Sequence, residues 1–297
     1  MPKCASTWLQ RHLFKERHGY RSVMSAKEAY FTLVWPIPFR FSDWREAREA
    51  IDWQGGDEVP VLSAEVLAGN PLTGGDNAET NMHRLHRVFP DAKILLIIRE
   101  QRAMLRSIYK SLVNFGSTLS IKDHLYNDLP GDMPAFGPHY LQYHRLIAGY
   151  QHTFGSDSVL VLPMELFQEN PQEFLSRINA YSGVDSERYP LPPGLNARVN
   201  VNQTLVNIEL KRLFNRFIAR TRLNYSGVYT PKLVGGAAQT RVAVPGFVDR
   251  YLEKRFADTV EFMTSSTFND SNDITQQLTG LDLAQYGYKL SASGGAQ

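Results

Sequence analysis

Three stretches of the chain are apolar runs of the kind that form buried β-strands. Residues 91–100 read DAKILLIIRE, in which a continuous apolar run is bounded by Pro90 and by charged residues. Residues 157–167 contain a second run, which ends at Pro163, and residues 58–67 contain a shorter third run. Continuous apolar runs of this length are typical of strands that are buried on both faces, as in a parallel sheet. We therefore expect a strand in each stretch.

Helical patterns lie between and after these runs, at residues 77–89, 101–115, 139–155 and 170–184. The last pattern has Pro171 near its start and Gly183 where a C-cap belongs. Strands that alternate with helices of this length predict an α/β fold, with a central parallel sheet flanked by helices and right-handed crossovers. Ligands of such sheets bind at the carboxyl ends of the strands, which is where Arg99, Glu65 and Glu165 fall.

The chain begins MPKCASTWLQRHLF, which reads as a loop that leads into a helix. Apolar residues between Trp8 and Leu13 recur at helical spacing, and Ser6 or Thr7 can cap the helix. The small residues of the loop leave backbone amides open, and Lys3 adds a positive charge beside them. A helix N-terminus with these features can bind an anion, although an ordinary capped helix explains the pattern equally well.

Composition and charge restrict the class of protein. The 297 residues are 43% hydrophobic and 21% charged, as in an ordinary globular protein. We expect one domain over residues 1–290 and a disordered tail at 291–297. The net charge of +2 argues against bulk nucleic-acid binding. Basic residues gather in 81–122 and 198–222, which suits a compact polyanionic ligand, although a solvated basic face has the same pattern.

A single cysteine, Cys4, excludes an intramolecular disulfide and a cysteine-rich metal site. The longest apolar run, residues 92–98, is far shorter than a membrane span, and the first residues do not resemble a signal peptide. We therefore expect a cytoplasmic protein. His83 and His86 share a helix face, a pattern that is more often structural than metal-binding, so no metal ion is expected.

A second candidate anion site lies after the central apolar run. Arg99 ends that run, and Ser107 follows eight residues later in the expected helix. A guanidinium at a strand end and a hydroxyl about two helical turns later can converge on one phosphate. The alternative is a solvated helix face with Arg99 as its neighbour.

Together, PKCASTWLQ and IIREQRAMLRSIY resemble the two nucleotide-binding motifs of the sulfotransferases that use 3′-phosphoadenosine 5′-phosphosulfate (PAPS). The first is similar to the 5′-phosphosulfate loop of the family, P-K-[ST]-G-[ST]-T-W-L, and the second to its 3′-phosphate motif. Cys4 and Ala5 depart from the loop pattern, which has Ser or Thr and then Gly.

Further segments extend the resemblance over most of the chain. Residues 159–184 are similar to a strand–Glu–Leu–helix segment of the family, residues 198–205 to a loop near the nucleotide, and residues 278–288 to the ending of bacterial-type members. The resemblance is weakest across 36–56 and 117–138. It implies a P-loop-like three-layer α/β fold with a central parallel sheet.

The resemblance also implies roles for the loop residues. Lys3 would bridge the 5′-phosphate and the sulfonate and would stabilise the leaving phosphate. Ser6 and Thr7 would bind the 5′-phosphate through hydroxyl and backbone amide, and Trp8 would stack on adenine. A preorganised lysine beside amide dipoles is also the stabilisation that in-line sulfonate transfer requires.

Arg99 and Ser107 would hold the 3′-phosphate by the same resemblance, and Arg198 would lie near the nucleotide. The residues expected to bind the donor are thus Lys3, Cys4, Ala5, Ser6, Thr7, Trp8, Arg99, Ser107 and Arg198.

The acceptor hydroxyl must lose a proton, so a base is required. Glu28 lies in KEAYF, which resembles the K-E-x-x-F segment of heparan-type sulfotransferases, in which the Glu acts as base. Glu65 falls where cytosolic sulfotransferases place their catalytic His. We place Glu28 ahead of Glu65, although either can be an ordinary exposed or ion-paired residue.

The expected function is transfer of a sulfonate from PAPS to a hydroxyl of a carbohydrate, glycolipid or small-molecule acceptor. The heparan-like segment favours the first two, and residues 35–44 and 127–140 are candidate acceptor loops. A P-loop kinase or NTPase is one alternative, although the Walker motif G-x-x-x-x-G-K-[ST] is missing. A non-catalytic nucleotide-binding protein is another alternative. A strand normally precedes a phosphate loop, but here only Met1 precedes Pro2, and a site without that strand can be incomplete.

Overall fold

A computed structural model describes residues 1, 3–35, 48–49, 51, 55–126, 136–193, 204–218, 224 and 245–291. The expectation for Arg198 lies outside the described residues. So do most of both candidate acceptor loops, 35–44 and 127–140, and the tail beyond Ser291.

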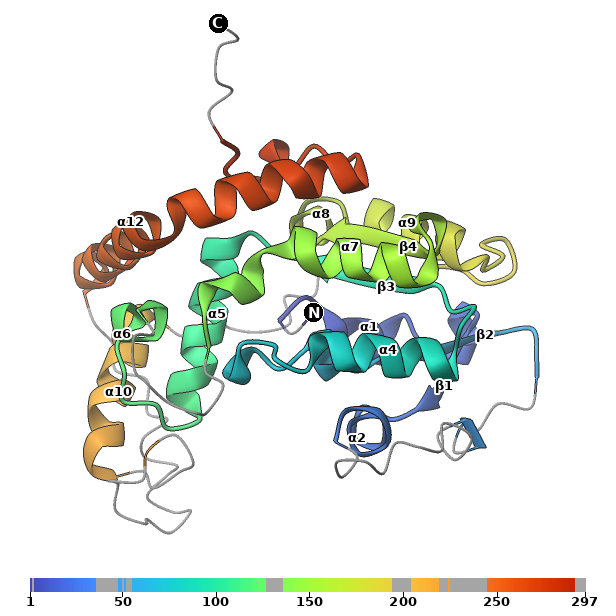
Figure 1. Ribbon diagram of the computed structural model, residues 1–297, viewed down its shortest axis with the longest axis horizontal. Helices are drawn as coiled ribbons and strands as arrows, with labels where there is room; N and C mark the ends of the chain where they lie inside the picture. Colours follow the sequence, from blue (N-terminus) through green and yellow to red (C-terminus); the bar gives the residue numbers. More distant parts are fainter. Residues whose placement is uncertain are drawn as a thin grey trace, which may run out of the picture.

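The described part of the chain contains short strands and mostly longer helices (Figure 1). The strands are β1 (Tyr20–Met24), β2 (Val59–Leu62), β3 (Ile94–Ile98) and β4 (Val159–Pro163). The α-helices are α1 (Ser6–His12), α2 (Ala26–Ala29), α4 (Ala78–Val88), α5 (Gln101–Asn114), α6 (Ile121–Leu125), α7 (Tyr143–Phe154), α8 (Met164–Glu169), α9 (Pro171–Ser182), α10 (Leu205–Ile218) and α12 (Gly246–Thr279). Short turns include the 3-10 helices η3 (Glu65–Ala68) and η5 (Pro138–Leu141) and the π-helical η2 (Tyr30–Val34).

Each predicted strand and helix is present, and the α/β class is confirmed. The three apolar runs form β2, β3 and β4, and the four helical patterns form α4, α5, α7 and α9. Gly183 ends α9 with a φ of 84°, as its C-cap position predicted. Strand β1 and the 34-residue helix α12 were not predicted from the sequence.

The described strands form two parallel pairs, β1 with β2 and β3 with β4, whereas the sequence predicted one central sheet. In the second pair, Ile94 lies opposite Val159 and Ile98 opposite Pro163, so both strands end at the same level. Met1 lies beside this pair, because its terminal ammonium donates a hydrogen bond to the Ile97 carbonyl at 3.4 Å.

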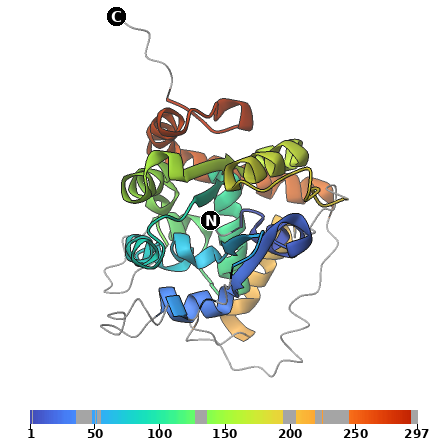
Figure 2. The same ribbon diagram turned by 90° about the vertical axis from the view of Figure 1, so that its right-hand side faces the viewer.

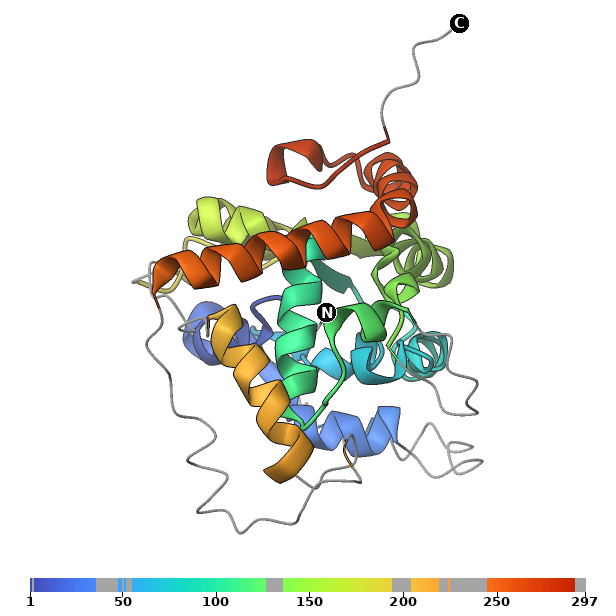
Figure 3. The same ribbon diagram turned by 90° about the vertical axis from the view of Figure 1, so that its left-hand side faces the viewer.

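Helices cover the strand pairs in layers. Helix α7 packs against both β3 and β4, as the crossover between parallel strands requires, and α12 packs on the outer side of α7 (Figure 1). The view from the right-hand side shows α7 and α9 below α12 and the first elements of the chain on the opposite side (Figure 2). The view from the left shows α10 and α5 side by side under α12 (Figure 3).

Polar bonds tie the first strand pair to the rest of the core. The buried Tyr20 of β1 donates its hydroxyl proton to Asn179 Oδ1 at 2.8 Å, and its oxygen lies 2.8 Å from Ser182 Oγ. Both partners belong to α9, which follows β4. Apolar residues of both strand pairs also belong to one hydrophobic core, so packing and these hydrogen bonds together hold the pairs in place.

Gly69 ends the turn that carries Glu65, and its backbone leaves no room for a side chain. Its φ is 89° and its ψ is 155°, a region that essentially only glycine adopts. A Cβ at Gly69 would lie 2.9 Å from Gly75 Cα, which is backbone and cannot move aside cheaply. Gly155 has nearly the same backbone, φ 89° and ψ 144°, with no atom near such a Cβ.

We expect Gly155→Ala to lower the free energy of unfolding by about 1–3 kcal/mol through backbone strain alone. Gly69→Ala should lower the free energy of unfolding by about 1–3 kcal/mol more than Gly155→Ala does, because the added methyl also crowds Gly75. Urea unfolding of both variants measures the difference. Equal losses would show that the close approach of Gly69 and Gly75 does not exist in solution.

Candidate functional site

The loop before α1 has an unusual backbone. Lys3 and Ala5 are the non-glycine residues with positive φ, at 62° and 55°, within the described part of the chain. Ala5 is the N-cap of α1 and makes no side-chain cap bond, so the predicted capping by Ser6 or Thr7 is wrong. The left-handed backbone at Ala5 explains why glycine suits this position in the family's loop pattern.

This loop meets the second motif directly. Arg99 Nη1 donates a hydrogen bond to the Lys3 carbonyl oxygen at 3.4 Å, across 96 residues of sequence. Arg99 Nε is buried and has no hydrogen-bond partner among the described atoms. The guanidinium of Arg99 therefore lies beside the loop and retains capacity to donate.

Glu65 lies on the other side of the same loop. Ser6 donates its hydroxyl proton to Glu65 Oε1. Gln10 of α1 donates to the Ser63 carbonyl at 2.9 Å, which ties the helix to the end of β2. The structure thus brings one of the two candidate bases to the first turn of α1.

Glu28 lies elsewhere and has a different task. It forms a capping box at the start of α2, in which Ser25 N donates to Glu28 Oε2 at 2.8 Å and Glu28 N donates to Ser25 Oγ at 3.2 Å. Hydrogen bonds with the side chain and then the backbone of Ser25 lower the pKa of the exposed Glu28 carboxyl. A carboxylate with a lowered pKa is a weaker base, so this placement does not favour Glu28 as the catalytic base.

Trp8 and Cys4 face the core. Trp8 is 4% exposed, and its ring packs against His12 and Phe167 with centroid distances of 4.9 Å to each. Its predicted stacking on adenine does not fit this placement, because apolar spacing on α1 turns the ring inward. Cys4 is 1% exposed, so its predicted contact with the donor does not fit this placement either.

The remaining predicted donor residues lie at the surface. Lys3 and Thr7 are exposed, and Ala5 and Ser6 are half-buried. Ser107 lies half-buried on α5, and no hydrogen bond of its hydroxyl is present among the described residues. No hydrogen bond joins Ser107 to Arg99 in the described structure, so their convergence on one phosphate stays a prediction.

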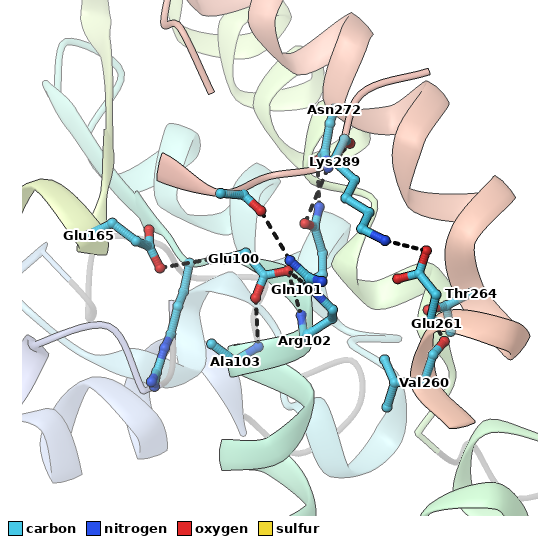
Figure 4. Close-up of polar contacts among 12 residues, drawn as sticks. Glu100, Gln101, Arg102, Ala103, Glu165, Val260, Glu261, Thr264, Asn272 and Lys289 are labelled. Atoms are coloured by element: carbon cyan, nitrogen blue, oxygen red, sulfur yellow. Dashed lines mark hydrogen bonds and ion pairs between the residues drawn. The ribbon is translucent and has the colours of Figure 1, made fainter. Parts of the chain in front are cut away.

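Polar residues surround the end of β3, and the sequence predicted no role for them. Glu165, recognised only as a strand-end residue, accepts a hydrogen bond from Glu100 N at 3.0 Å (Figure 4). Tyr143 donates to the Arg99 carbonyl at 2.6 Å, and Tyr288 donates to Glu165 Oε2 at 3.2 Å. Burial raises the pKa of Glu165, against the lowering effect of the bond from Glu100 N. The resemblance of residues 278–288 to the family was the one sequence signal for Tyr288.

The assembled groups are a lysine, an arginine, a hydroxyl and a carboxylate around the first turn of a helix. The amides of that turn have no intrahelical partners, which favours an anion there. Within the described ranges, no group of three His, Cys, Asp or Glu side chains is arranged to bind a metal ion, and no helix is long and apolar enough to cross a membrane.

Cys4 should be unreactive in the folded protein. Burial raises the pKa of its thiol to about 11, so at pH 8 its thiolate fraction is about 100-fold below that of an ordinary thiol. We expect Ellman's reagent to modify native protein far more slowly than protein in urea, and the single cysteine makes the signal unambiguous. Equally fast modification in both conditions would contradict the inward orientation of the thiol.

Comparisons with known proteins gave a family match over part of the chain and a similar solved structure. A sulfotransferase from Alicyclobacillus acidocaldarius has a solved structure similar to this chain, with 20% identity, a TM-score of 0.49, and coverage of 72% of this chain and 90% of the other. No curated protein matches the chain significantly. Residues 77–188, which include Arg99, Ser107 and Glu165, match the model of the Sulfotransferase family. The match covers 112 of the 297 residues and agrees with the predicted resemblance to sulfotransferases in the segment that carries the second motif.

Proposed function

We propose that this protein transfers a sulfonate group from PAPS to a hydroxyl group of an acceptor. The match of residues 77–188 to the Sulfotransferase family model supports sulfotransfer as the general activity. The observation that carries the proposal is the hydrogen bond from Arg99 to the Lys3 carbonyl. It joins two motifs that the resemblance assigns to opposite ends of one nucleotide.

The residues around the loop fit the charges of such a donor. PAPS carries a 5′-phosphosulfate and a separate 3′-phosphate, so its site needs two cationic regions. Lys3 and the free amides of α1 can serve the first region. The Arg99 guanidinium can serve the second, and its buried, unpartnered Nε fits an accepting oxygen.

Each residue then has a definite chemical task. When bound, PAPS supplies a sulfonate whose bond to the phosphate oxygen breaks as the bond to the acceptor oxygen forms. Lys3 would offset the charge that builds on the leaving oxygen, a type of stabilisation that typically contributes about 10²–10³ in rate. Glu65 would accept the proton of the acceptor hydroxyl, and Ser6 would hold the Glu65 carboxylate in place.

Glu65 replaces Glu28 as the proposed base because of what each carboxylate contacts. Glu65 bonds to the first residue of α1, next to the loop. Glu28 caps α2 and has a lowered pKa.

A carbohydrate or glycolipid is part of the proposed acceptor class because the KEAYF segment resembles heparan-type sulfotransferases. Choosing Glu65 as the base removes the catalytic role of that segment and so reduces its support for such an acceptor. A single domain over residues 1–290 and a cytoplasmic setting, suggested by the free Cys4, complete the proposal.

The 3′-phosphate role of Arg99 can be tested by binding. Arg99→Ala should reduce the affinity for 3′-phosphoadenosine 5′-phosphate by about tenfold to 100-fold. The affinity for adenosine 5′-phosphate should fall by less than about threefold, because it has no 3′-phosphate to form the charge-assisted pair. Titration calorimetry of both nucleotides gives the ratio. Arg177→Ala, which removes an ion pair with Glu173 on α9, is the control and should change neither affinity. Equal losses for both nucleotides on Arg99→Ala would reject the proposed donor.

The choice of base can be tested by steady-state kinetics. Glu65→Gln keeps the oxygen that accepts from Ser6 but cannot take a proton, so kcat should fall by about 10²–10⁴ with donor affinity unchanged. Glu28→Gln should leave kcat within about threefold, since that carboxylate acts as a cap. The reverse pattern would restore Glu28 as the base and, with it, the heparan-type alignment.

A further inference from the structure

One peptide group in the structure is held by side chains at both of its polar ends. The carbonyl of Arg99 accepts a hydrogen bond from the Tyr143 hydroxyl at 2.6 Å. The amide of the next residue, Glu100, donates to Glu165 Oε1 at 3.0 Å. The carbonyl and amide belong to the single peptide plane that follows Arg99, so two side chains fix the orientation of that plane.

The fold brings these partners together. Ile98 and Pro163 are opposite each other at the ends of β3 and β4, so Arg99 and Glu165 follow their strands at the same edge. Tyr143 begins α7, which packs on both strands, and its side chain is 1% exposed. The two side chains therefore come from separate elements, with Tyr143 packed in the core and Glu165 half-buried.

The last segment of the chain completes the arrangement from outside. Tyr288 donates to the second oxygen of Glu165 at 3.2 Å. Arg102 Nη2 donates to the Gly287 carbonyl at 3.2 Å, and Asn272 Nδ2 donates to the Lys289 carbonyl at 2.9 Å. Figure 4 shows how Asn272, Lys289 and the start of α5 meet here. Both oxygens of Glu165 thus have protein donors.

We propose that Tyr143 and Glu165 are positioning residues that clamp the Arg99–Glu100 peptide and so aim the Arg99 guanidinium at the donor, with Tyr288 holding Glu165 in place. This inference rests on the proposed function, in which Arg99 binds the 3′-phosphate. An arginine fork binds a phosphate well only at the right angle, and a fixed peptide plane sets the direction in which its side chain leaves the backbone.

A purely structural role makes a different prediction. Buried polar groups need partners for stability alone, and variants that only destabilise the fold would weaken every ligand alike. A positioning role weakens the 3′-phosphate contact selectively. The ratio of affinities for 3′-phosphoadenosine 5′-phosphate and adenosine 5′-phosphate separates the two roles.

The experiment measures both affinities by titration calorimetry in four variants. Tyr143→Phe keeps the buried ring and removes one bond, and Glu165→Ala removes the other. Each should reduce the affinity for 3′-phosphoadenosine 5′-phosphate by about tenfold and that for adenosine 5′-phosphate by less than about twofold. Glu165→Gln keeps an oxygen for the Glu100 amide, so it should restore the affinity to within about twofold of the parent protein.

Tyr181→Phe is the matched control. Tyr181 donates to the Ile94 carbonyl at 3.3 Å, at the opposite end of the same strand, so its loss should change neither affinity. If Tyr143→Phe and Glu165→Ala leave the ratio unchanged, or if Glu165→Gln is as impaired as Glu165→Ala, the clamp is rejected.

A readout without nucleotide keeps the clamp separate from the proposed function. In Glu165→Ala the Glu100 amide loses its acceptor, and its hydrogen exchange should become at least about tenfold faster, with Glu165→Gln close to the parent protein. Unchanged exchange in Glu165→Ala overturns the clamp. If the parent protein itself does not prefer the 3′-phosphorylated nucleotide, the proposed function fails, while the exchange result still decides whether the peptide is clamped.

Discussion

The parallel register of β3 and β4 is the constraint on which the candidate site depends. Because Ile98 and Pro163 pair at the ends of their strands, the residues that follow them emerge at one edge. Arg99 is thereby placed next to the loop at Lys3, and Glu165 is placed next to the Arg99–Glu100 peptide. A shift of the register by one residue would turn every side chain of one strand to the opposite face and would separate these groups.

Much of this framework could be predicted from the sequence, for physical reasons. The runs that form β3 and β4 are continuously apolar, short and bounded by proline or charged residues, which is typical of strands buried on both faces. By contrast, the YRSVM sequence of β1 mixes polar and apolar residues and becomes a strand through tertiary partners, such as Asn179 of α9 bonding to Tyr20. The single predicted sheet became two parallel pairs in the described chain, because apolar runs indicate strands but do not specify their neighbours.

At the candidate site, the placements that differ from the motif matches have a common physical reason. Motif matching names residue types but does not determine which way a side chain points. Trp8 matched the family loop, yet the helical period of α1 turns its ring into the core against Phe167. Glu28 matched a catalytic segment, yet Ser25 three residues before it makes a capping box that engages the same carboxylate. No sequence motif pointed to Tyr143, because its contact with Arg99 depends on how α7 packs against the strands.

The bond between Tyr288 and Glu165 also bears on when the site is complete during synthesis. The two residues are separated by 123 positions, and a ribosome adds about 5–20 residues per second, so Tyr288 is added about 6–25 s after Glu165. In that interval the nascent chain contains Lys3, Arg99 and Glu165 but lacks the segment that supports them from outside. The hydrogen bond that holds Glu165 Oε2 can therefore form only after Tyr288 has been added, so Glu165 lacks this support during the early steps of folding on the ribosome.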